Sequence, residues 1–280
     1  MALFVVVTHE YDVFALRLGY GRPAVSGYLL FHALRALNEM GHSWRVSAGP
    51  DAGSADAAIL HVDATHVPEA YLALASRYPV AINFRAGDIS KRRIGKGLLR
   101  RGDDWPGPVI VKTDLNCHGR PEAVANARAA QAGRPAPYAE VVKFDDYPII
   151  ASLAEVPDSV WDDERLIVQR FLPERDSEGY ALRVWIFAGG RERCSRLVSP
   201  DPIVKADNVV SRRLVDVPPE LRAERERLGF DFGKFEFVVH EGEPILLDVN
   251  RTPGMSPKLA DVIKEGARNL AHGFAEMVSG

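Results

Sequence analysis

The sequence is poor in cysteine, has no long apolar run and shows no large excess of charge of either sign. Cys117 and Cys194 are the only cysteines, and their number and spacing fit neither a disulfide framework nor a zinc site. No segment approaches the roughly 18 consecutive apolar residues of a transmembrane helix. The short apolar run after Met1 also lacks the basic segment that begins a signal peptide. We therefore predict a cytoplasmic protein that does not enter a membrane.

The charge balance bears on the class of partner. The chain carries 35 basic and 38 acidic residues, a formal net charge of −3, so it lacks the general basic field that collects nucleic acid. Of its 280 residues, 46% are hydrophobic and 26% are charged, which is typical of a globular protein with room for two or three subdomains. We expect no nucleic-acid partner.

Strands and helices alternate over the first 90 residues. Apolar runs predict short buried strands at residues 4–7, 44–46, 57–62 and 80–83. Between them, helical spacing of leucines predicts a helix that ends at Gly41, and Pro68 opens a second helix that runs to about Tyr78. This order is typical of a small parallel α/β domain.

The pattern changes in the rest of the chain. The segments GPVIVKT, RLIVQRF and ALRVWIFAGG predict three buried strands, and DFGKFEFVVHEGEPILLDVN predicts a β-hairpin. An amphipathic helix follows from Ser256 and Pro257. We therefore predict a fold of the α/β plus α+β class, in which a small α/β domain precedes a larger antiparallel α+β region.

The hairpin brings acidic residues together. Phe235, Phe237 and Val239 alternate with Glu236 on the first strand, and Ile245, Leu247 and Val249 alternate with Asp248 and Asn250 on the second. A three-residue loop of Glu241, Gly242 and Glu243 would set Glu236 directly opposite Asp248, with Asn250 two residues further along the same face. Opposed carboxylates repel unless a cation lies between them, and carboxylate and amide oxygens suit Mg²⁺. The alternative is that both acids lie on a solvated outer face.

The segments LLDVNRTPG and GKFEFVV resemble the C-terminal motif and the preceding strand of the ATP-grasp superfamily. The resemblance implies that Glu236, Asp248 and Asn250 bind magnesium, expected as two ions, beside ATP. It also implies the domain order: a pre-ATP-grasp α/β domain over residues 1–90, an ATP-grasp lid subdomain over 91–168, and a C-terminal subdomain with the metal-binding hairpin over 169–280.

Further segments resemble the nucleotide-binding parts of the same superfamily. GPVIVKT resembles the strand whose terminal lysine reaches the phosphates, and DISKR resembles a segment that supplies a second lysine. TDLNCHGRPE resembles the loop that closes over the phosphates, and LIVQRFLPE resembles the hinge that receives adenine. The implied nucleotide-binding residues are Lys91, Lys112, Asn116, Gly119, Lys143, Gln169, Arg170, Phe171, Leu172 and Glu174, the last for the ribose. The loop departs from the usual Gly/Ser-rich form. Lysines at strand ends are also commonly solvated charges, and that alternative stays open.

Two later segments resemble the superfamily's acceptor side. GYALRVWIFAGG resembles the strand whose arginine faces the transferred phosphoryl group, and its alternation suggests that Arg183 points away from the core and toward the site. VKADNVVSRR resembles a segment that lines the acceptor site, which nominates Lys205, Asn208 and Arg212 as catalytic candidates with Arg183.

The resemblance implies an enzyme, an ADP-forming carboxylate–amine or carboxylate–thiol ligase. ATP would phosphorylate a small-molecule or peptide carboxylate, and an amine would attack the acyl phosphate. Two alternatives remain: a small-molecule kinase, and a non-catalytic ATP-binding protein. The sequence leaves a homodimer open.

Overall fold

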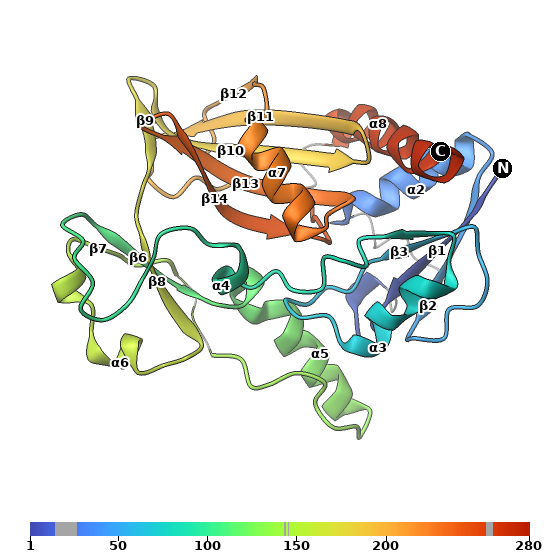
Figure 1. Cartoon of the computed structure of the whole chain (residues 1–280), viewed down its shortest axis with the longest axis horizontal. Helices are drawn as coiled ribbons and strands as arrows, with labels where there is room; N and C mark the ends of the chain where they lie inside the picture. The colour runs from blue at the N-terminus through green and yellow to red at the C-terminus, as the bar shows by residue number, and fades with distance from the viewer. Residues whose placement is uncertain (15–26, 143, 145, 256–259) are drawn as a thin grey trace.

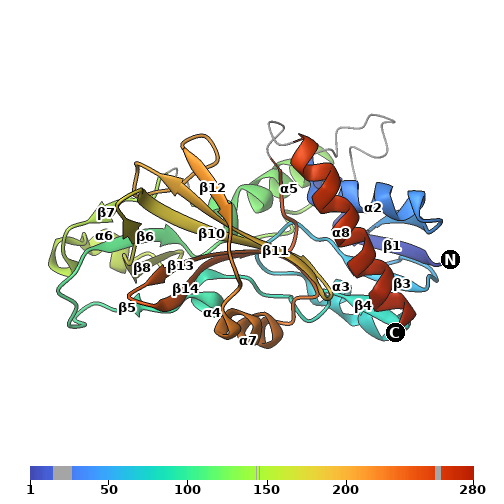
Figure 2. The ribbon, with the colours of Figure 1, turned by 90° about the horizontal axis from the view of Figure 1, so that it is seen from above.

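A computed structural model of the chain describes residues 1–14, 27–142, 144, 146–255 and 260–280. Within these residues the chain forms three sheets, which occupy three regions of the molecule (Figure 1). The N-terminal sheet lies at one end, a small sheet at the other end, and the largest sheet above and between them (Figures 1 and 2). None of the described helices combines the length and the apolar character that a membrane-crossing helix needs.

The N-terminal sheet is parallel, as the alternation of strands and helices predicts. Its strands, in spatial order, are β2 (Ser43–Ala48), β1 (Leu3–Thr8), β3 (Ala57–Leu60) and β4 (Val80–Ile82). One face packs on α2 (Leu29–Glu39) and α8 (Ala260–Ser279), and the other on α3 (Glu69–Leu72) and the 3₁₀ helix η2 (Ala73–Arg77). The single helix expected from Pro68 is thus two short ones, and the start of the last helix at Ser256 lies outside the described residues.

The largest sheet is antiparallel and carries the predicted hairpin. Its order is β12 (Ser211–Leu214), β11 (Arg191–Ser199), β10 (Gly179–Ala188), β13 (Phe232–His240) and β14 (Glu243–Asn250), with β9 (Glu174–Asp176) paired to β10. On one face, Trp185, Phe187, Phe235 and Phe237 form a fully buried aromatic core beneath α7 (Pro219–Leu228). The opposite face of β10 and β13 is therefore free to line a cavity.

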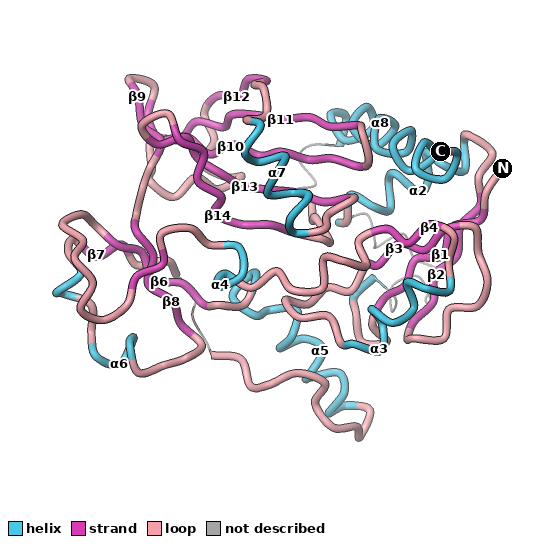
Figure 3. The backbone as a smooth tube through the Cα atoms, viewed as in Figure 1, coloured by secondary structure: helices cyan, strands magenta, loops and turns pink. Residues whose placement is uncertain are grey.

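The small sheet is also antiparallel. Its order is β5 (Leu98–Leu99), β8 (Leu166–Arg170), β6 (Val109–Thr113) and β7 (Ile149–Ile150). The short helices near it are α4 (Lys91–Ile94), η3 (Asn116–Gly119), α5 (Arg120–Gln131), η4 (Leu153–Glu155) and α6 (Asp158–Trp161). The chain leaves this sheet at the end of β8 and enters the large sheet at β9, so residues 171–173 connect the two (Figure 3).

The hairpin confirms the expected pairing of Glu236 with Asp248, but the predicted three-residue loop is wrong. The loop has two residues, Glu241 and Gly242, both with positive φ (+51° and +88°), as a tight hairpin turn requires. A β-bulge between Glu236 and Phe237 restores the register, because Leu247 is the extra residue on β14. The bulge exchanges the faces beyond it, so Leu246 is buried in the core, where Leu247 was expected.

Arg251, immediately after β14, ties the large sheet to the N-terminal domain. Its guanidinium is fully buried and donates to the backbone carbonyls of Val62, Ala64 and Ala86. Burial, partly offset by Asp63, lowers its pKa to about 10, so it stays charged at neutral pH. The guanidinium therefore points toward the N-terminal sheet rather than toward Glu236 and Asp248.

We expect Arg251→Met to lower the free energy of unfolding by about 3 kcal/mol or more, because it leaves three buried carbonyls without donors. Urea unfolding followed by circular dichroism measures this loss. Arg268→Ala is the control, because its pair with Glu39 is exposed and its loss should leave the midpoint unchanged. Equal effects of the two variants would contradict the role given to Arg251.

Candidate active site

A cavity of about 1180 Å³ lies along the face of the large sheet opposite its aromatic core. Its walls come from β10 to β14, from the 202–210 loop, from the connection after β8, from α4 and β6, and from α8. Of the candidate residues named from the sequence, these line it: Lys91, Lys112, Gln169, Arg170, Phe171, Leu172, Glu174, Lys205, Arg212, Glu236 and Asp248. Segments more than 150 residues apart in the chain thus meet in one cavity.

Glu236 and Asp248 face the cavity side by side, and each is paired with a lysine. Lys234 Nζ lies 2.5 Å from Glu236 Oε1, and Lys91 Nζ contacts Asp248 Oδ1. Each carboxylate keeps 26% of its side chain exposed to the cavity, so it is accessible to a further ligand. The repulsion between the acids is therefore offset by two ammonium groups, and a metal ion is not needed to explain their closeness.

Lys91 is placed by the turn that opens α4. The Ser90 hydroxyl accepts a hydrogen bond from Arg93 N, and the Lys91 N–H donates to the Asp114 carbonyl at 2.9 Å. These bonds fix α4 against the end of β6, so that the buried Lys91 side chain reaches Asp248 across the cavity.

Lys112 is a buried cation of the site. It lies on β6, is 8% exposed, and donates to Gln169 Oε1 at 3.0 Å. Burial first, and then the Lys91 ammonium, lower its pKa to about 8, against the pull of Asp248 and Glu236. Lys234 behaves in the opposite way: burial opposes its charge, but the Glu236 carboxylate outweighs burial and raises its pKa. Three lysines thus meet two carboxylates.

The donor set fits a magnesium ion that also takes ligands from its substrate. Two accessible carboxylates lie together, and Mg²⁺ typically takes one or two carboxylates and completes its shell with water and phosphate oxygens. The described residues hold no group of three acidic, histidine or cysteine ligands. Asn250 Oδ1 accepts from Thr252 N at 2.8 Å and Thr252 Oγ1 at 3.2 Å, and Asn250 is not among the residues that line the cavity. The structure therefore brings two of the three expected ligands together.

The connection after β8 offers backbone groups to the cavity. Arg170 N and Phe171 N donate to Gly97 O and Pro108 O, each at 2.9 Å. Leu172, by contrast, makes no backbone hydrogen bond to any described residue, and it lines the cavity between Phe171 and Pro173. A free N–H and C=O at such a position can read the edge of a planar base.

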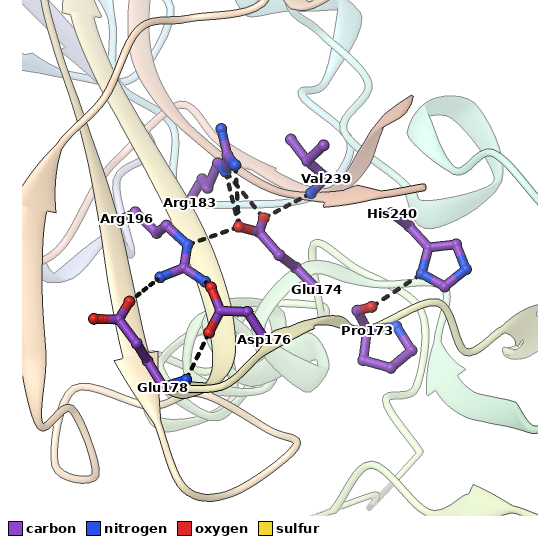
Figure 4. A network of polar contacts seen from close by, with 8 residues as sticks. All are labelled: Pro173, Glu174, Asp176, Glu178, Arg183, Arg196, Val239 and His240. Carbon is purple, nitrogen blue, oxygen red and sulfur yellow. Dashed lines mark hydrogen bonds and ion pairs between the residues drawn. The ribbon is translucent and has the colours of Figure 1, made fainter. Parts of the chain in front are cut away.

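Glu174 and Arg183 belong to one ion-pair network (Figure 4). Arg183 Nε donates to Glu174 Oε2 at 2.9 Å, Arg196 Nε donates to Oε1 at 2.7 Å, and Val239 N donates to Oε2 at 2.8 Å. Burial opposes ionisation of Glu174, but these donors prevail and lower its pKa. Arg196 also contacts Asp176 and Glu178, so the network fastens β9 to the large sheet.

The prediction that Arg183 points toward the site is wrong. Leu182 and Val184 line the cavity, while Arg183 shares the other face of β10 with Trp185, because successive side chains alternate. The structure therefore holds Arg183 against Glu174 and does not bring it into the cavity. Glu174 does line the cavity, but a ribose hydroxyl would have to share oxygens that already accept hydrogen bonds.

Of the remaining candidate residues, some line the cavity and others lie outside its lining. Asn116 and Gly119 are buried in η3 and are not among the described residues that line the cavity; a Cβ at Gly119 would lie 2.5 Å from Val141. Asn208 holds the 201–208 loop through Asp201 and Ile203, and it lies outside the lining too. Lys205 and Arg212 line the cavity, and Lys143 lies outside the described residues.

Two residues of the site were missed in the sequence. Lys234 reads there as an ordinary strand lysine, although its position two residues before Glu236 puts both side chains on one face. Tyr147 lines the cavity from the segment before β7, and its ring centroid lies 4.4 Å from that of His118, with the ring planes tilted by 38°. No local pattern marks Tyr147, because the small sheet alone brings it there.

We expect Glu174→Gln to lower the free energy of unfolding by about 3 kcal/mol, because it weakens the pairing of the fully buried Arg196. Urea unfolding measures the loss. Glu178→Gln is a matched control in the same network, because the Glu178 side chain is 57% exposed. Losses of equal size would show that Glu174 is no more important than the rim of the network.

Comparison with known proteins supports the fold and reaches no further. No protein-family model and no curated protein matches the sequence. Among solved structures, the D-alanine–D-alanine ligase of Bacillus anthracis is 14% identical, with 100% of this chain and 97% of that chain covered and a TM-score of 0.54; its complex with ATP gives the same identity and score. Macrocyclase MdnC of Microcystis aeruginosa MRC, bound with precursor peptide MdnA, is 11% identical over 98% and 99% of the chains, with a TM-score of 0.52. This chain therefore shares the fold of these two proteins over almost its whole length.

Proposed function

We propose that this protein is a Mg-ATP-dependent ligase that activates a carboxylate as an acyl phosphate for attack by an amine, with release of ADP. The observation that carries the proposal is the cavity in which Glu236 and Asp248, opposed on neighbouring strands, meet Lys91, Lys112 and Lys234. Accessible carboxylates beside several cations suit the handling of a metal–polyphosphate. The likeness to a ligase solved with ATP, and to a macrocyclase solved with a peptide, supports the same class of reaction.

The reaction has two steps. A carboxylate oxygen of the substrate attacks the terminal phosphorus of ATP, the bond to the bridging oxygen breaks, and ADP leaves. The amine nitrogen then attacks the acyl carbon, the bond to the phosphate oxygen breaks, and phosphate leaves while the nitrogen loses a proton to solvent. No protein nucleophile is required, so catalysis depends on positioning and on charge.

The residues of this chain take separate tasks in that scheme. Lys112 and Lys91 attract the nucleotide phosphates, Lys234 offsets the charge that develops beside Glu236, and Leu172 with Phe171 receives the adenine. Glu236 and Asp248 would hold magnesium, which supplies Lewis-acid neutralisation of phosphate charge when bound. Arg212 lies on β12, at the other end of the wall that carries Glu236, and Lys205 lies on the 202–210 loop; the acceptor would bind beside them. We place the reaction in the cytoplasm, as the cysteine content favours.

We expect the wild-type protein, given ATP, MgCl₂, hydroxylamine and a panel of carboxylic acids, to release ADP and form a hydroxamate. Glu236→Gln and Asp248→Asn should each lower both products by about a hundredfold or more, because each removes a metal-binding charge. Glu243→Gln, on the same hairpin but exposed, should retain activity.

The same assay separates the alternatives. A phosphorylated product without hydroxamate would identify a kinase, because only an acyl phosphate reacts with hydroxylamine. Full activity in both carboxylate variants, with folding confirmed by circular dichroism, would contradict the proposed site.

Nucleotide binding should weaken as the pH rises from 7 to 9.5. The folded pKa of Lys112 is lowered to about 8, so its ammonium is present below pH 8 and lost above it, and only the charged form attracts phosphate. Calorimetric titration with Mg·AMP-PNP measures the affinity. Lys112→Met should bind about tenfold more weakly at pH 7 and show a flatter pH profile. Lys96→Met, whose ammonium instead lies near Glu224, should keep the wild-type profile; an unchanged profile in Lys112→Met would refute the assignment.

A further inference from the structure

Two arginines on the cavity face lack an acidic partner among the described residues. Arg193 lies on β11 and Arg212 on β12, and both line the cavity. Arg212 donates to the Ser195 hydroxyl from Nε at 3.2 Å and from Nη2 at 3.0 Å. Arg193 Nε is buried and has no hydrogen-bond partner. Arg193 is half-buried and Arg212 is exposed, so both guanidinium groups are accessible from the cavity, and the buried Nε of Arg193 lacks a partner that an anionic ligand could supply.

Several neighbouring arginines do have acidic partners. Arg191 and Arg196 of β11 pair with Glu276 and Glu174, and Arg183 of β10 also pairs with Glu174. Burial, followed by the charge of Arg193, lowers the pKa of Arg212, so the two cations act on each other without a carboxylate between them. A bound anion would relieve that repulsion.

The acidic residues of the cavity wall do not serve this pair. Four of them already have basic partners. Glu174 pairs with Arg183 and Arg196, and Glu192 pairs with Arg222. Glu236 pairs with Lys234, and Asp248 pairs with Lys91. Glu265 on α8 also lines the cavity, but it is exposed and forms no ion pair with either arginine. Among the described residues, no acidic side chain of the cavity therefore pairs with Arg193 or Arg212, which leaves both open to an anionic group of a ligand.

The strand register sets the distance from the arginines to the catalytic acids. Ser195, which holds the Arg212 guanidinium, pairs with Val184, and Val184 pairs with Glu236. Arg193 is related to Lys234 in the same way through Ile186. Two strand spacings amount to about 10 Å. The arginine pair thus lies about that far from the lysine–carboxylate cluster, on the same wall.

The wall between these two polar ends is apolar. Val184 and Ile186 of β10 lie directly between them, and Leu182, Leu197 and Leu214 border the arginine end. Leu214 is 63% exposed, so its side chain is accessible to an apolar part of a ligand. The complementary ligand has an acidic group at each end and an apolar middle.

We propose that Arg193 and Arg212, with the Ser195 hydroxyl, form a subsite for a second carboxylate of the substrate, separated by an apolar spacer from the carboxylate that reacts. This assignment rests on the ligase function proposed above and specifies its substrate class. The pair binds and orients the substrate, and it takes no part in the bond changes. Arginine suits this task because its planar fork can hold a carboxylate through two parallel hydrogen bonds.

Matched acids test the subsite by calorimetric titration, with and without Mg·AMP-PNP. One arm compares suberate with octanoate, and the other compares the peptides Asp-Val-Val and Asn-Val-Val; the arms distinguish a free dicarboxylic acid from an acidic peptide. In at least one arm the compound with the second carboxylate should bind the wild-type protein about tenfold more tightly than its partner. Arg193→Gln and Arg212→Gln should each reduce that preference to about twofold or less.

Arg213→Gln is the matched control. Arg213 lies on the same strand as Arg212 but on the opposite face, outside the cavity lining, so this variant should keep the full preference. The proposal is wrong if neither arm shows a preference in the wild-type protein, or if the preference survives in Arg193→Gln. Failure of Mg·AMP-PNP to bind would count against the ligase proposal instead, and the titrations without nucleotide would still decide the subsite.

Discussion

The opposition of Glu236 and Asp248 on β13 and β14 is the constraint on which the rest of the site depends. Two carboxylates at neighbouring strand positions repel, and the chain brings in one lysine for each: Lys234 from the same strand and Lys91 from α4. The Lys91 contact joins a segment beside the small sheet to the large sheet. The same pair of charges thus defines the reactive end of the cavity and holds its two walls together.

The residues at the end of β14 connect the hairpin to the N-terminal sheet. Within four residues of Asp248, Asn250 caps the turn at Thr252, and Arg251 binds three carbonyls of the segments that follow β3 and β4. Thr252 Oγ1 also donates to Asp63 at 2.7 Å. A short motif therefore does two things: its acid faces the cavity, and the residues that follow fix the position of the strand against the parallel sheet.

The sequence predicted the parallel N-terminal sheet, the strands β6, β8 and β10 and the facing of Glu236 and Asp248, because alternation and apolar runs are local signals. It did not predict β11 or β12, which complete the large sheet. It could not predict the bulge, since Leu246 and Leu247 are the same residue type and only tertiary packing decides which one enters the core. The face of Arg183 was missed for a related reason. Alternation gives two sets of side chains, but the aromatic core beneath α7 decides which set faces the cavity. Lys234 and Tyr147 became visible only once distant strands met.

The balance of positive and negative charge in the cavity explains how the acidic and basic side chains can lie close together before a substrate binds. Lys91, Lys112 and Lys234 set three positive charges against the two of Glu236 and Asp248, which leaves one positive charge in excess when all are ionised. Lys112 donates a hydrogen bond only to a neutral partner, Gln169, and burial together with the nearby Lys91 ammonium lowers its pKa. On the proposed function, an arriving nucleotide gives Lys112 the anion it lacks, and Lys91 and Lys234 can turn from the carboxylates to phosphate as those carboxylates take up a metal. Glu236, Asp248, Lys91 and Lys234 would then keep partners of opposite charge before and after binding, and Lys112 would gain one.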